Sequence, residues 1–340
     1  MRAWRSRWWR VLACAVVCAA LVGAPGRVGA ATSTQIVVSG YGVSPGSLPY
    51  AIITAKGYFK DEGLDVAIRS AVGSDVVRTI VAGDLPYGEA SVIAVIAANE
   101  QGANLRIISG NINTMGEVIW VTMPNSPIKT INDIRGKRIA FTTPLSATQA
   151  LTYLMLERLR MKPEDVQLVA AGGFPQALTA LEHGGVDVAT VVEPLFSAKP
   201  GRYRALATAN QVLPVMANVL GLTTAKHAAQ DGDLLRAILR ARARAVKFII
   251  ANPAETAKIA APIWSVDTDV MERVIRGLIE HGGVGSVPYF GEGEIYVEGI
   301  ENMIHAEQLI GVVKGDVPLE PIVDQSFLPT YLKTRDLFKK

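Results

Sequence analysis

Residues 39–66 read SGYGVSPGSLPYAIITAKGYFKDEGLDV, the pattern of a turn, a helix and the start of a strand. Alternating apolar residues at 35–39 predict a short strand before the turn. Ser47 and Pro49 favour a helix start, because serine caps helices and the first helical turn tolerates the amide that proline lacks. Gly57 ends the predicted helix, and residues 64–68 predict the next strand.

A strand, turn and helix in this order place backbone amides at the carboxyl edge of a sheet, where α/β proteins usually hold small ligands. The turn also contains G-x-S-x-G at 42–46, the pattern of the serine-hydrolase nucleophile elbow. Its serine is followed by Pro45, which has no N–H to offer an oxyanion hole. We therefore interpret Ser44 as a hydrogen-bonding loop residue and not as a nucleophile.

Residues 1–30 have the pattern of a cleavable secretory signal, and we expect the exported chain to begin near Ala31. Arginines without any acid precede an apolar run at 11–22, and small residues follow at 28–30. Both cysteines, Cys14 and Cys18, lie in this segment. The exported chain is therefore expected to have no disulfide, no thiol nucleophile and no thiolate metal site.

The net charge of +3 does not indicate a nucleic-acid partner. The sequence has 34 basic and 31 acidic residues, but five of the basic ones lie in the first 30 residues, which leaves 29 basic residues beyond them. The basic run at 236–247 is interpreted as the solvated face of a helix. The four histidines have no metal-ligand spacing, so we predict no metal site.

Predicted strands and helices alternate from residue 35 to about 222, which favours mostly parallel α/β sheets flanked by helices. After residue 228 the pattern is mostly helical. Prolines near residues 124 and 214 interrupt the chain between strand-like segments. We predict two lobes joined by two hinge strands: residues 31–123 with 218–340 form the first lobe, and residues 124–217 form the second.

Several segments match one known family in order over about residues 34–200. They are GYFKDEGLDV at 57–66, SPIK at 126–129, DIRGKRIA at 133–140, EDV at 164–166, GGVDV at 184–188 and Glu193-Pro194. The chain resembles the periplasmic solute-binding proteins of ABC importers, in the nitrate/sulfonate/taurine and thiamine-precursor family. One departure is Pro86, which stands where the family usually has an aspartate.

The resemblance implies the type II periplasmic-binding-protein fold and a periplasmic receptor that is a monomer, without catalysis or cofactor. Two lobes would close on a small solute and deliver it to a membrane permease that works with an ATPase subunit. A sensor that presents its solute to a signalling protein is a further interpretation. An enzyme of the thiamine-pyrimidine-synthase type is the alternative from another class. That enzyme family carries a cysteine-rich motif, and the exported chain has no cysteine.

The expected ligand-binding residues come from both lobes. The first lobe contributes Tyr41, Ser44, Gly46, Ser47 and Leu48 from the opening turn, with Ala90 and Ser91 after the strand-like segment at 85–89. The second lobe contributes Ser146, Ala147 and Thr148, then Gly173 and Phe174, and Glu193. Ser146 and Thr148 are equally well explained as helix caps, Phe174 as a core residue, and Glu193 as part of an interlobe ion pair.

The expected solute is a small organic anion, and a nitrogen-containing heteroaromatic is the alternative. Amides at helix ends favour a sulfonate, nitrate or taurine-like organic anion. Glu193, with Tyr41 and Phe174, favours a thiamine-precursor pyrimidine or another nitrogen-containing heteroaromatic.

Overall fold

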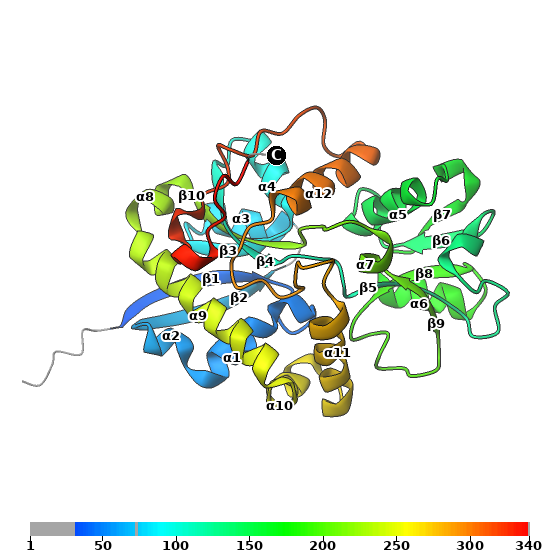
Figure 1. The fold of residues 1–340 in the computed structure, drawn as a ribbon, viewed down its shortest axis with the longest axis horizontal. Helices are drawn as coiled ribbons and strands as arrows, with labels where there is room; N and C mark the ends of the chain where they lie inside the picture. Colours follow the sequence, from blue (N-terminus) through cyan, green and yellow to red (C-terminus); the bar gives the residue numbers. More distant parts are fainter. Residues whose placement is uncertain (1–30, 72–73, 339–340) are drawn as a thin grey trace, which may run out of the picture.

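Two mixed five-stranded sheets organise residues 31–71 and 74–338, the part of the chain that this computed structural model describes (Figure 1). The first sheet has the order β2-β1-β3-β10-β4, with β1 Thr32–Ser39, β2 Leu64–Ala71, β3 Tyr87–Ala90, β4 Leu105–Ile112 and β10 Val219–Thr224. The second has the order β7-β6-β8-β5-β9, with β5 Val118–Thr122, β6 Arg138–Phe141, β7 Gln167–Ala170, β8 Val188–Val192 and β9 Arg204–Thr208. The predicted α/β class is confirmed.

Each sheet has a parallel part and an antiparallel part. In the first sheet β1 pairs in parallel with β2 and β3, whereas β10 is antiparallel to β3 and β4. In the second sheet β6 pairs in parallel with β7 and β8, whereas β5 is antiparallel to β8 and β9. Strand β10, late in the chain, lies between β3 and β4, and strand β5, earlier in the chain, lies between β8 and β9. The chain therefore passes from the first sheet to the second after β4 and returns after β9.

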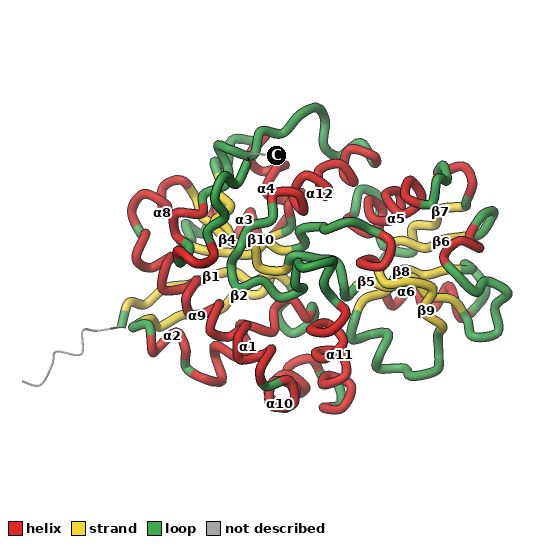
Figure 2. Tube along the Cα trace, in the orientation of Figure 1, coloured by secondary structure: helices red, strands yellow, loops and turns green. Residues whose placement is uncertain are grey.

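Helices flank both sheets (Figure 2). Around the first sheet lie α1 Leu48–Lys56, α2 Tyr58–Asp61, α3 Ser74–Ala82, α4 Val92–Glu100, α8 Ala225–Gln230, α9 Gly232–Ala251, α10 Pro253–Trp264, α11 Thr268–His281 and α12 Val297–Leu309. With the second sheet lie α5 Ala147–Arg158, α6 Phe174–Glu182 and α7 Ala209–Val212. Short 3₁₀ turns occupy Pro45–Ser47, Ile131–Ile134, Pro163–Asp165, Gln325–Phe327 and Thr330–Leu332. Helix α1 begins directly after Ser47 and ends at Gly57, whose φ of 72° suits glycine.

The apolar run at 117–123 predicts a strand, which forms, but its assignment to the first lobe is wrong. As β5 it pairs with β8 and β9, so the chain leaves the first sheet before Val118. All five residues of β5 are buried, with Val118 and Trp120 on one face and Ile119 and Val121 on the other. A strand apolar on both faces is stable only in a sheet covered on both sides, and the second sheet supplies that place.

Two helices that the sequence patterns predict do not form as expected, and one strand was missed. The helix predicted from residue 194 onward is replaced by turns at 193–198, and the helix predicted at 329–338 is reduced to the 3₁₀ turn Thr330–Leu332. Strand β9 was not predicted, because RALAT alternates only weakly, as suits a half-exposed edge strand. The predicted signal at 1–30 lies outside the described residues. No helix in the described ranges is both long and apolar enough to cross a membrane.

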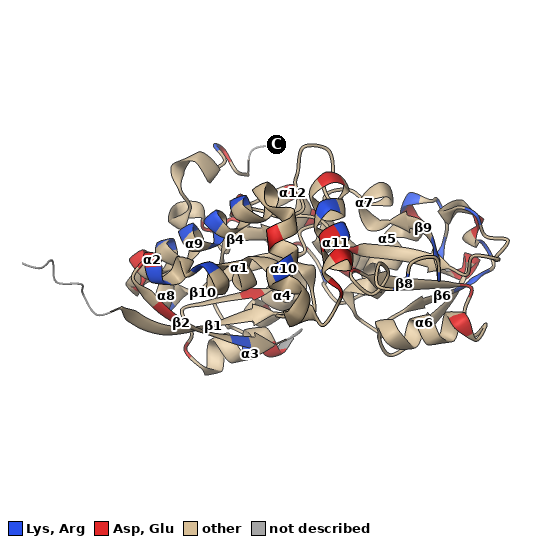
Figure 3. Ribbon diagram, turned by 90° about the horizontal axis from the view of Figure 1, so that it is seen from below, with Lys and Arg blue, Asp and Glu red and all other residues tan. Residues whose placement is uncertain are grey.

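The exposed basic face of α9 is held in ion pairs. Arg240 pairs with Glu62 and Arg244 with Asp61, both at the end of α2. The Arg244 guanidinium also lies 3.9 Å from the centroid of the Tyr58 ring. Figure 3 shows basic residues spaced along this helix. The basic run at 236–247 thus forms an exposed face of α9, and the ion pairs connect this face to α2.

The opposite face of α9 carries a buried ion pair. Arg242 is fully buried, and its Nε donates to Glu89 Oε1 on β3 at 3.2 Å. Its Nη2 donates to the Asn111 carbonyl at 2.7 Å, and its Nη1 donates to the Gly291 carbonyl. The Tyr50 hydroxyl donates to the same Glu89 oxygen at 2.8 Å. The pair therefore joins α1, β3, β4 and α9.

We predict that Arg242→Met lowers the free energy of unfolding by about 3–5 kcal/mol, because it leaves the Glu89 carboxylate buried without its counter-charge. Arg240→Met is the matched control on the same helix, and the loss of its exposed pair with Glu62 should cost less than about 1 kcal/mol. Urea unfolding of both variants measures the difference. Equal losses would contradict the structural importance of the buried pair.

A second buried carboxyl lies on α12. Glu307 is fully buried, and neither of its carboxylate oxygens has a hydrogen-bond partner among the described residues. Burial raises the pKa of Glu307 to about 7, from an ordinary value of 4.5. The folded protein therefore keeps a proton that the unfolded chain releases between these two values, and stability falls as the pH rises through that window.

We predict that Glu307→Gln, which resembles the protonated acid, is more stable than the wild type by up to about 3 kcal/mol at pH 8 and nearly equal to it at pH 5. Urea unfolding at both pH values tests this expectation. The exposed Glu164→Gln serves as the control and should change stability at neither pH. A Glu307→Gln variant with the same pH dependence as the wild type would show that this carboxyl is hydrated in solution.

Candidate functional site

Two segments cross between the sheets, residues 113–117 and 213–218, and side chains join them. Asn218 Nδ2 donates to Glu117 Oε1 at 2.5 Å, which links the second crossing to the first. The Asn113 amide donates to the Tyr289 carbonyl at 3.0 Å. Thr114 Oγ1 donates to the Gly282 carbonyl. Both crossings and the segment at 282–289 thus form one hydrogen-bonded unit between the two sheets.

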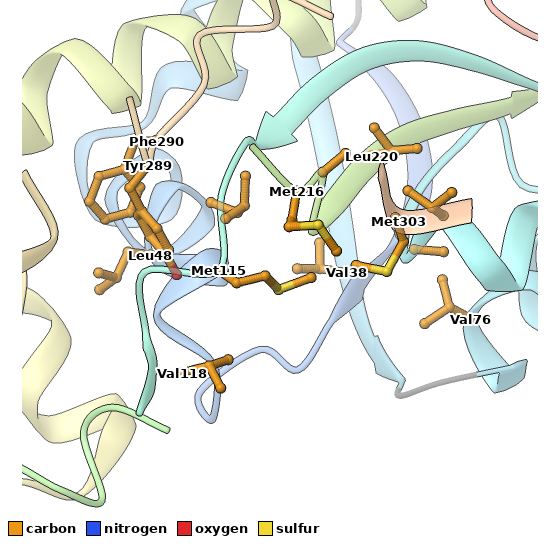
Figure 4. Packing of buried hydrophobic residues seen from close by; sticks show 14 of the residues in the cluster. Val38, Leu48, Val76, Met115, Val118, Met216, Leu220, Tyr289, Phe290 and Met303 are labelled. Atoms are coloured by element: carbon orange, nitrogen blue, oxygen red, sulfur yellow. The ribbon is translucent and has the colours of Figure 1, made fainter. Parts of the chain in front are cut away.

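Glu117 and Tyr289 form the polar centre of this unit. Both are buried, and neither Glu117 Oε2 nor the Tyr289 hydroxyl completes a hydrogen bond within the described residues. Burial raises the pKa of Glu117 to about 7, although Asn218 and Tyr289 oppose the shift. The Tyr289 hydroxyl thus lies close enough to the carboxyl to lower its pKa. In Figure 4 the Tyr289 hydroxyl points toward the turn beside Met115, with Leu48 and Val118 nearby.

The predicted residue Glu193 lies next to this centre. Its amide donates to the Glu117 carbonyl at 2.9 Å. Its carboxylate accepts hydrogen bonds from the Ser197 hydroxyl at 2.9 Å and the Ser197 amide at 3.1 Å. Burial raises the pKa of Glu193, and the charge of Arg273 on α11 opposes this. The charges of Glu117 and Glu193 both add to the burial that raises the pKa of Tyr289.

Sequence reasoning missed Glu117 and Tyr289. Glu117 is the first residue of the strand predicted at 117–123 and lies one residue before β5, and Tyr289 lies in an irregular segment without a motif. The signal that could have found Glu117 is a lone acid at the start of an otherwise apolar strand, since a buried acid needs a specific reason. A cavity of about 520 Å³ lies close to Glu193, lined by residues 198 and 200 and by the start of α11 including Arg273.

The opening turn of the first lobe uses its polar groups internally. Ser44 Oγ accepts from the Gly46 amide at 3.2 Å, and the Ser47 hydroxyl donates to the carbonyls of Gly40 and Ser44. Ser47 and the next residue, Leu48, are fully buried. Their side chains therefore hold the turn in place, and the Ser44 side chain remains half-buried at its edge.

The other first-lobe candidates differ in exposure. Ala90 is buried, whereas Ser91 is half-buried at the start of α4. Tyr41 is half-buried, and its ring centroid lies 6.3 Å from that of Trp264 on α10. Tyr41, Ser44 and Ser91 are therefore the first-lobe candidates whose side chains keep a solvent-facing part.

Three hydroxyls cluster before α5 in the second lobe. Thr142 Oγ1 lies 2.7 Å from Thr148 Oγ1 and 3.1 Å from Ser146 Oγ, and Ser146 Oγ lies 2.9 Å from Thr148 Oγ1. Thr148 Oγ1 also accepts from the Thr142 amide at 2.9 Å, and Ser146 caps the Gln149 amide at 3.3 Å. Ser146 is thus a helix cap. No hydrogen bond of the described residues uses the amides of Ala147 and Thr148.

Phe174 is half-buried at the start of α6, next to Gly173. It belongs to neither buried apolar cluster of the described residues. This placement disfavours the interpretation that Phe174 fills the core. Among the described residues, no three or more His, Cys, Asp or Glu side chains lie close enough together to hold a metal ion.

Two five-stranded sheets joined by two crossings, with helices on their faces, define a periplasmic-binding-protein fold. Solved structures of this class agree. The aliphatic sulphonate binding protein SsuA of Escherichia coli superposes with a TM-score of 0.73 at 17% identity, covering 91% of this chain and 96% of that one. The nitrate-binding protein NrtA of Synechocystis PCC 6803 gives 0.67 at 14% identity, covering 87% of each chain.

The sequence profile described as NMT1/THI5 like matches residues 44–256, so the chain belongs to the NMT1/THI5-like family. The riboflavin-binding protein RibY of Chloroflexus aurantiacus is 26% identical over 213 residues, 61% of this chain and 60% of that protein. The 4-amino-5-hydroxymethyl-2-methylpyrimidine phosphate synthase THI13 of Saccharomyces cerevisiae is 22% identical over 230 residues, 63% and 66%. The chain thus spans three fifths to two thirds of these relatives. The predicted resemblance is confirmed.

We predict that Thr148→Val destabilises the protein by about 1–3 kcal/mol, because the half-buried Thr142 amide loses its acceptor. The matched control is Thr179→Val, whose exposed hydroxyl bonds only to the Pro175 carbonyl one turn earlier. Thermal unfolding of the two variants measures the difference. An unchanged midpoint in Thr148→Val would indicate that water replaces this hydroxyl.

Proposed function

We propose that the protein is the periplasmic solute-binding component of an ABC importer, which captures a small solute between two lobes and delivers it to the permease. The hydrogen-bonded unit around Glu117 carries this proposal, because it connects both crossings at the place where loops of the two sheets meet. A solute that touches both halves shifts the balance between open and closed arrangements. The corrected first lobe comprises residues 31–117 and 218–340.

The solute that fits best is a nitrogen-containing heteroaromatic with an N–H edge, such as a thiamine-precursor pyrimidine. Two carboxyls, Glu117 and Glu193, lie at the junction. The candidate loops at 40–48, 90–91, 142–148 and 172–174 contain no basic residue. An anion would therefore face acids with Arg273 as the nearby compensating charge. The curated relatives support this choice, since their names refer to riboflavin and to an aminopyrimidine.

A sulfonate, nitrate or taurine-like anion is the second candidate. The unpaired amides of Ala147 and Thr148 at the start of α5 favour it, because a helix N-terminus attracts negative charge. Half-buried hydroxyls of Thr142 and Ser146 would add donors at the same place. These groups belong to the second lobe alone, whereas the heteroaromatic would also meet Tyr41 of the first lobe.

A receptor is favoured over a synthase. The resemblance links the synthase to a cysteine-rich motif, and the sequence has no cysteine after Cys18. Two lobes that meet at a junction can capture a solute and release it chemically unchanged. Incubation of the purified protein with the pyrimidine, followed by chromatography, distinguishes the two: a new product would contradict the receptor.

The central experiment compares solutes by thermal shift and calorimetry. The panel contains 4-amino-5-hydroxymethyl-2-methylpyrimidine and riboflavin on one side, and taurine, an alkanesulfonate and nitrate on the other. A solute present at 100 times its dissociation constant should stabilise the protein by about 2.7 kcal/mol. Binding of the anions alone would overturn the heteroaromatic assignment, and stabilisation by no member would remove the support for both classes.

We predict that Glu193→Gln weakens binding of the heteroaromatic by about 10- to 100-fold, because a charged acceptor for its N–H group is lost. Anion binding should stay equal or improve. Titration calorimetry measures both, and the exposed Glu164→Gln in the same lobe is the control. If Glu193→Gln leaves every affinity unchanged, Glu193 serves the hinge and not the pocket.

A further inference from the structure

We propose that Glu117 makes the hinge sensitive to protons: loss of its proton favours opening of the two lobes, and its protonation favours the arrangement described above. The hinge part of this inference stands on the two crossings alone. Its consequence for solute affinity rests on the proposed function.

Glu117 lies where the lobes must move. Its backbone carbonyl accepts from Glu193 at the end of β8, and its Oε1 accepts from Asn218 at the end of the second crossing. The preceding Gly116 packs against the Gly282 backbone, where an added Cβ would lie 2.4 Å from the Gly282 oxygen. Rotation of one sheet relative to the other changes backbone angles in these crossings, so it also displaces the Glu117 carboxyl.

The carboxyl suits the described arrangement only when it is protonated. Glu117 Oε2 is buried without a donor, and the nearby Tyr289 hydroxyl is also unpaired. A protonated acid stays neutral and can donate to the Tyr289 hydroxyl oxygen. An ionised acid can accept from the Asn218 amide and the Tyr289 hydroxyl, but neither donor carries a positive charge, and a buried negative charge without a counter-charge is strongly unfavourable.

The charged surroundings do not supply a counter-charge. The groups that shift the pKa of Glu117 are its own amide, Asn218 and Tyr289, acting against burial, and none of them is basic. Glu193 acts on Tyr289, and Arg273 acts on Glu193. The resulting pKa of about 7 places the change of charge within the physiological range.

The sign of the effect follows from the two arrangements. In an open hinge water reaches the carboxyl, and its pKa returns toward the ordinary value of 4.5. Between these two values the described arrangement holds a proton that the open one releases. A fall in pH therefore favours the described arrangement by at most tenfold per pH unit, and opening by ionisation levels off above about pH 7.

Small-angle X-ray scattering without solute tests the hinge directly. The wild type should have a larger radius of gyration at pH 8 than at pH 5.5, whereas Glu117→Gln should keep the smaller radius at both. Glu307→Gln is the matched control: it removes another buried carboxyl whose pKa is raised to about 7, but on α12, and it should keep the wild-type response. An equal response in the wild type and Glu117→Gln would overturn the proposal.

Two outcomes remain decisive if Glu117→Gln fails to fold. A wild-type radius that is constant from pH 5.5 to 8 would overturn the proposal by itself. Tyr289→Phe removes a hydroxyl that lowers the pKa of Glu117, so its pH response should move to higher pH, and a response at the wild-type pH in this variant would count against the pair. Because no solute is present, these results stand even where the proposed solutes fail to bind.

A solute from the panel that does bind adds a second readout. Calorimetry at pH 7 in buffers of different ionisation enthalpy should show proton uptake on binding in the wild type and its loss in Glu117→Gln. The wild-type affinity should rise by no more than tenfold per unit as the pH falls from 7 to 6. If both proteins take up the same number of protons on binding, the proton linked to binding belongs to a group other than Glu117.

Discussion

The buried ion pair between Glu89 and Arg242 constrains the rest of the structure. The two residues are 153 positions apart, yet Arg242 also holds the carbonyls of Asn111 and Gly291, and Tyr50 adds a donor to Glu89. Burial raises the pKa of Glu89, and the charge of Arg242 opposes that shift. An ion pair removed from water is tolerated only when its remaining donors and acceptors are satisfied. The surrounding elements must therefore keep one arrangement.

This constraint reaches the first crossing. Asn111 belongs to β4 and is followed by Asn113, whose amide bonds to the Tyr289 carbonyl. The Gly110 amide bonds to the Gly293 carbonyl on the other side of the pair. Since Arg242 fixes Asn111 and Gly291 together, the start of the crossing and the Tyr289 segment are held at a defined separation. The residues that follow approach the 282–289 segment closely, with the Gly116 backbone packed against Gly282.

Local patterns predicted much of the fold, and nonlocal contacts limited the rest. The start of α1 at Leu48 and its end at Gly57 followed from Ser47, Pro49 and a glycine suited to a positive φ. The sheet that β5 joins did not, because pairing with β8 and β9 leaves no mark in the five residues themselves. The partner strand β9 was missed because its residues, RALAT, alternate only weakly at a half-exposed edge of the sheet.

The candidate site divides in the same way. Glu193 stood out because an acid followed a buried strand, and the structure brings it to the junction. Ser47 was predicted to bind ligand because it lies in the turn before α1. Its hydroxyl instead donates to two carbonyls of that turn and stabilises it. The sequence around Glu117 shows a lone acid at the start of an apolar strand, but its proximity to Tyr289 arises through the crossings and is not visible in the sequence near either residue.

The proposed capture of a solute and the proposed proton sensitivity share one hydrogen bond. The Glu193 carboxylate accepts from Ser197 and feels the charge of Arg273, which lines the cavity, while its amide is bonded to the Glu117 carbonyl. A solute that draws the Glu193 carboxyl toward itself also pulls on the first crossing, and the Asn218 side chain passes the displacement to the second. Coupling between binding and lobe movement therefore needs no long pathway, because the ligand-facing acid and the hinge acid are already adjacent. Ionisation of Glu117 acts on the same contact from the hinge side, so solute and proton bias one equilibrium.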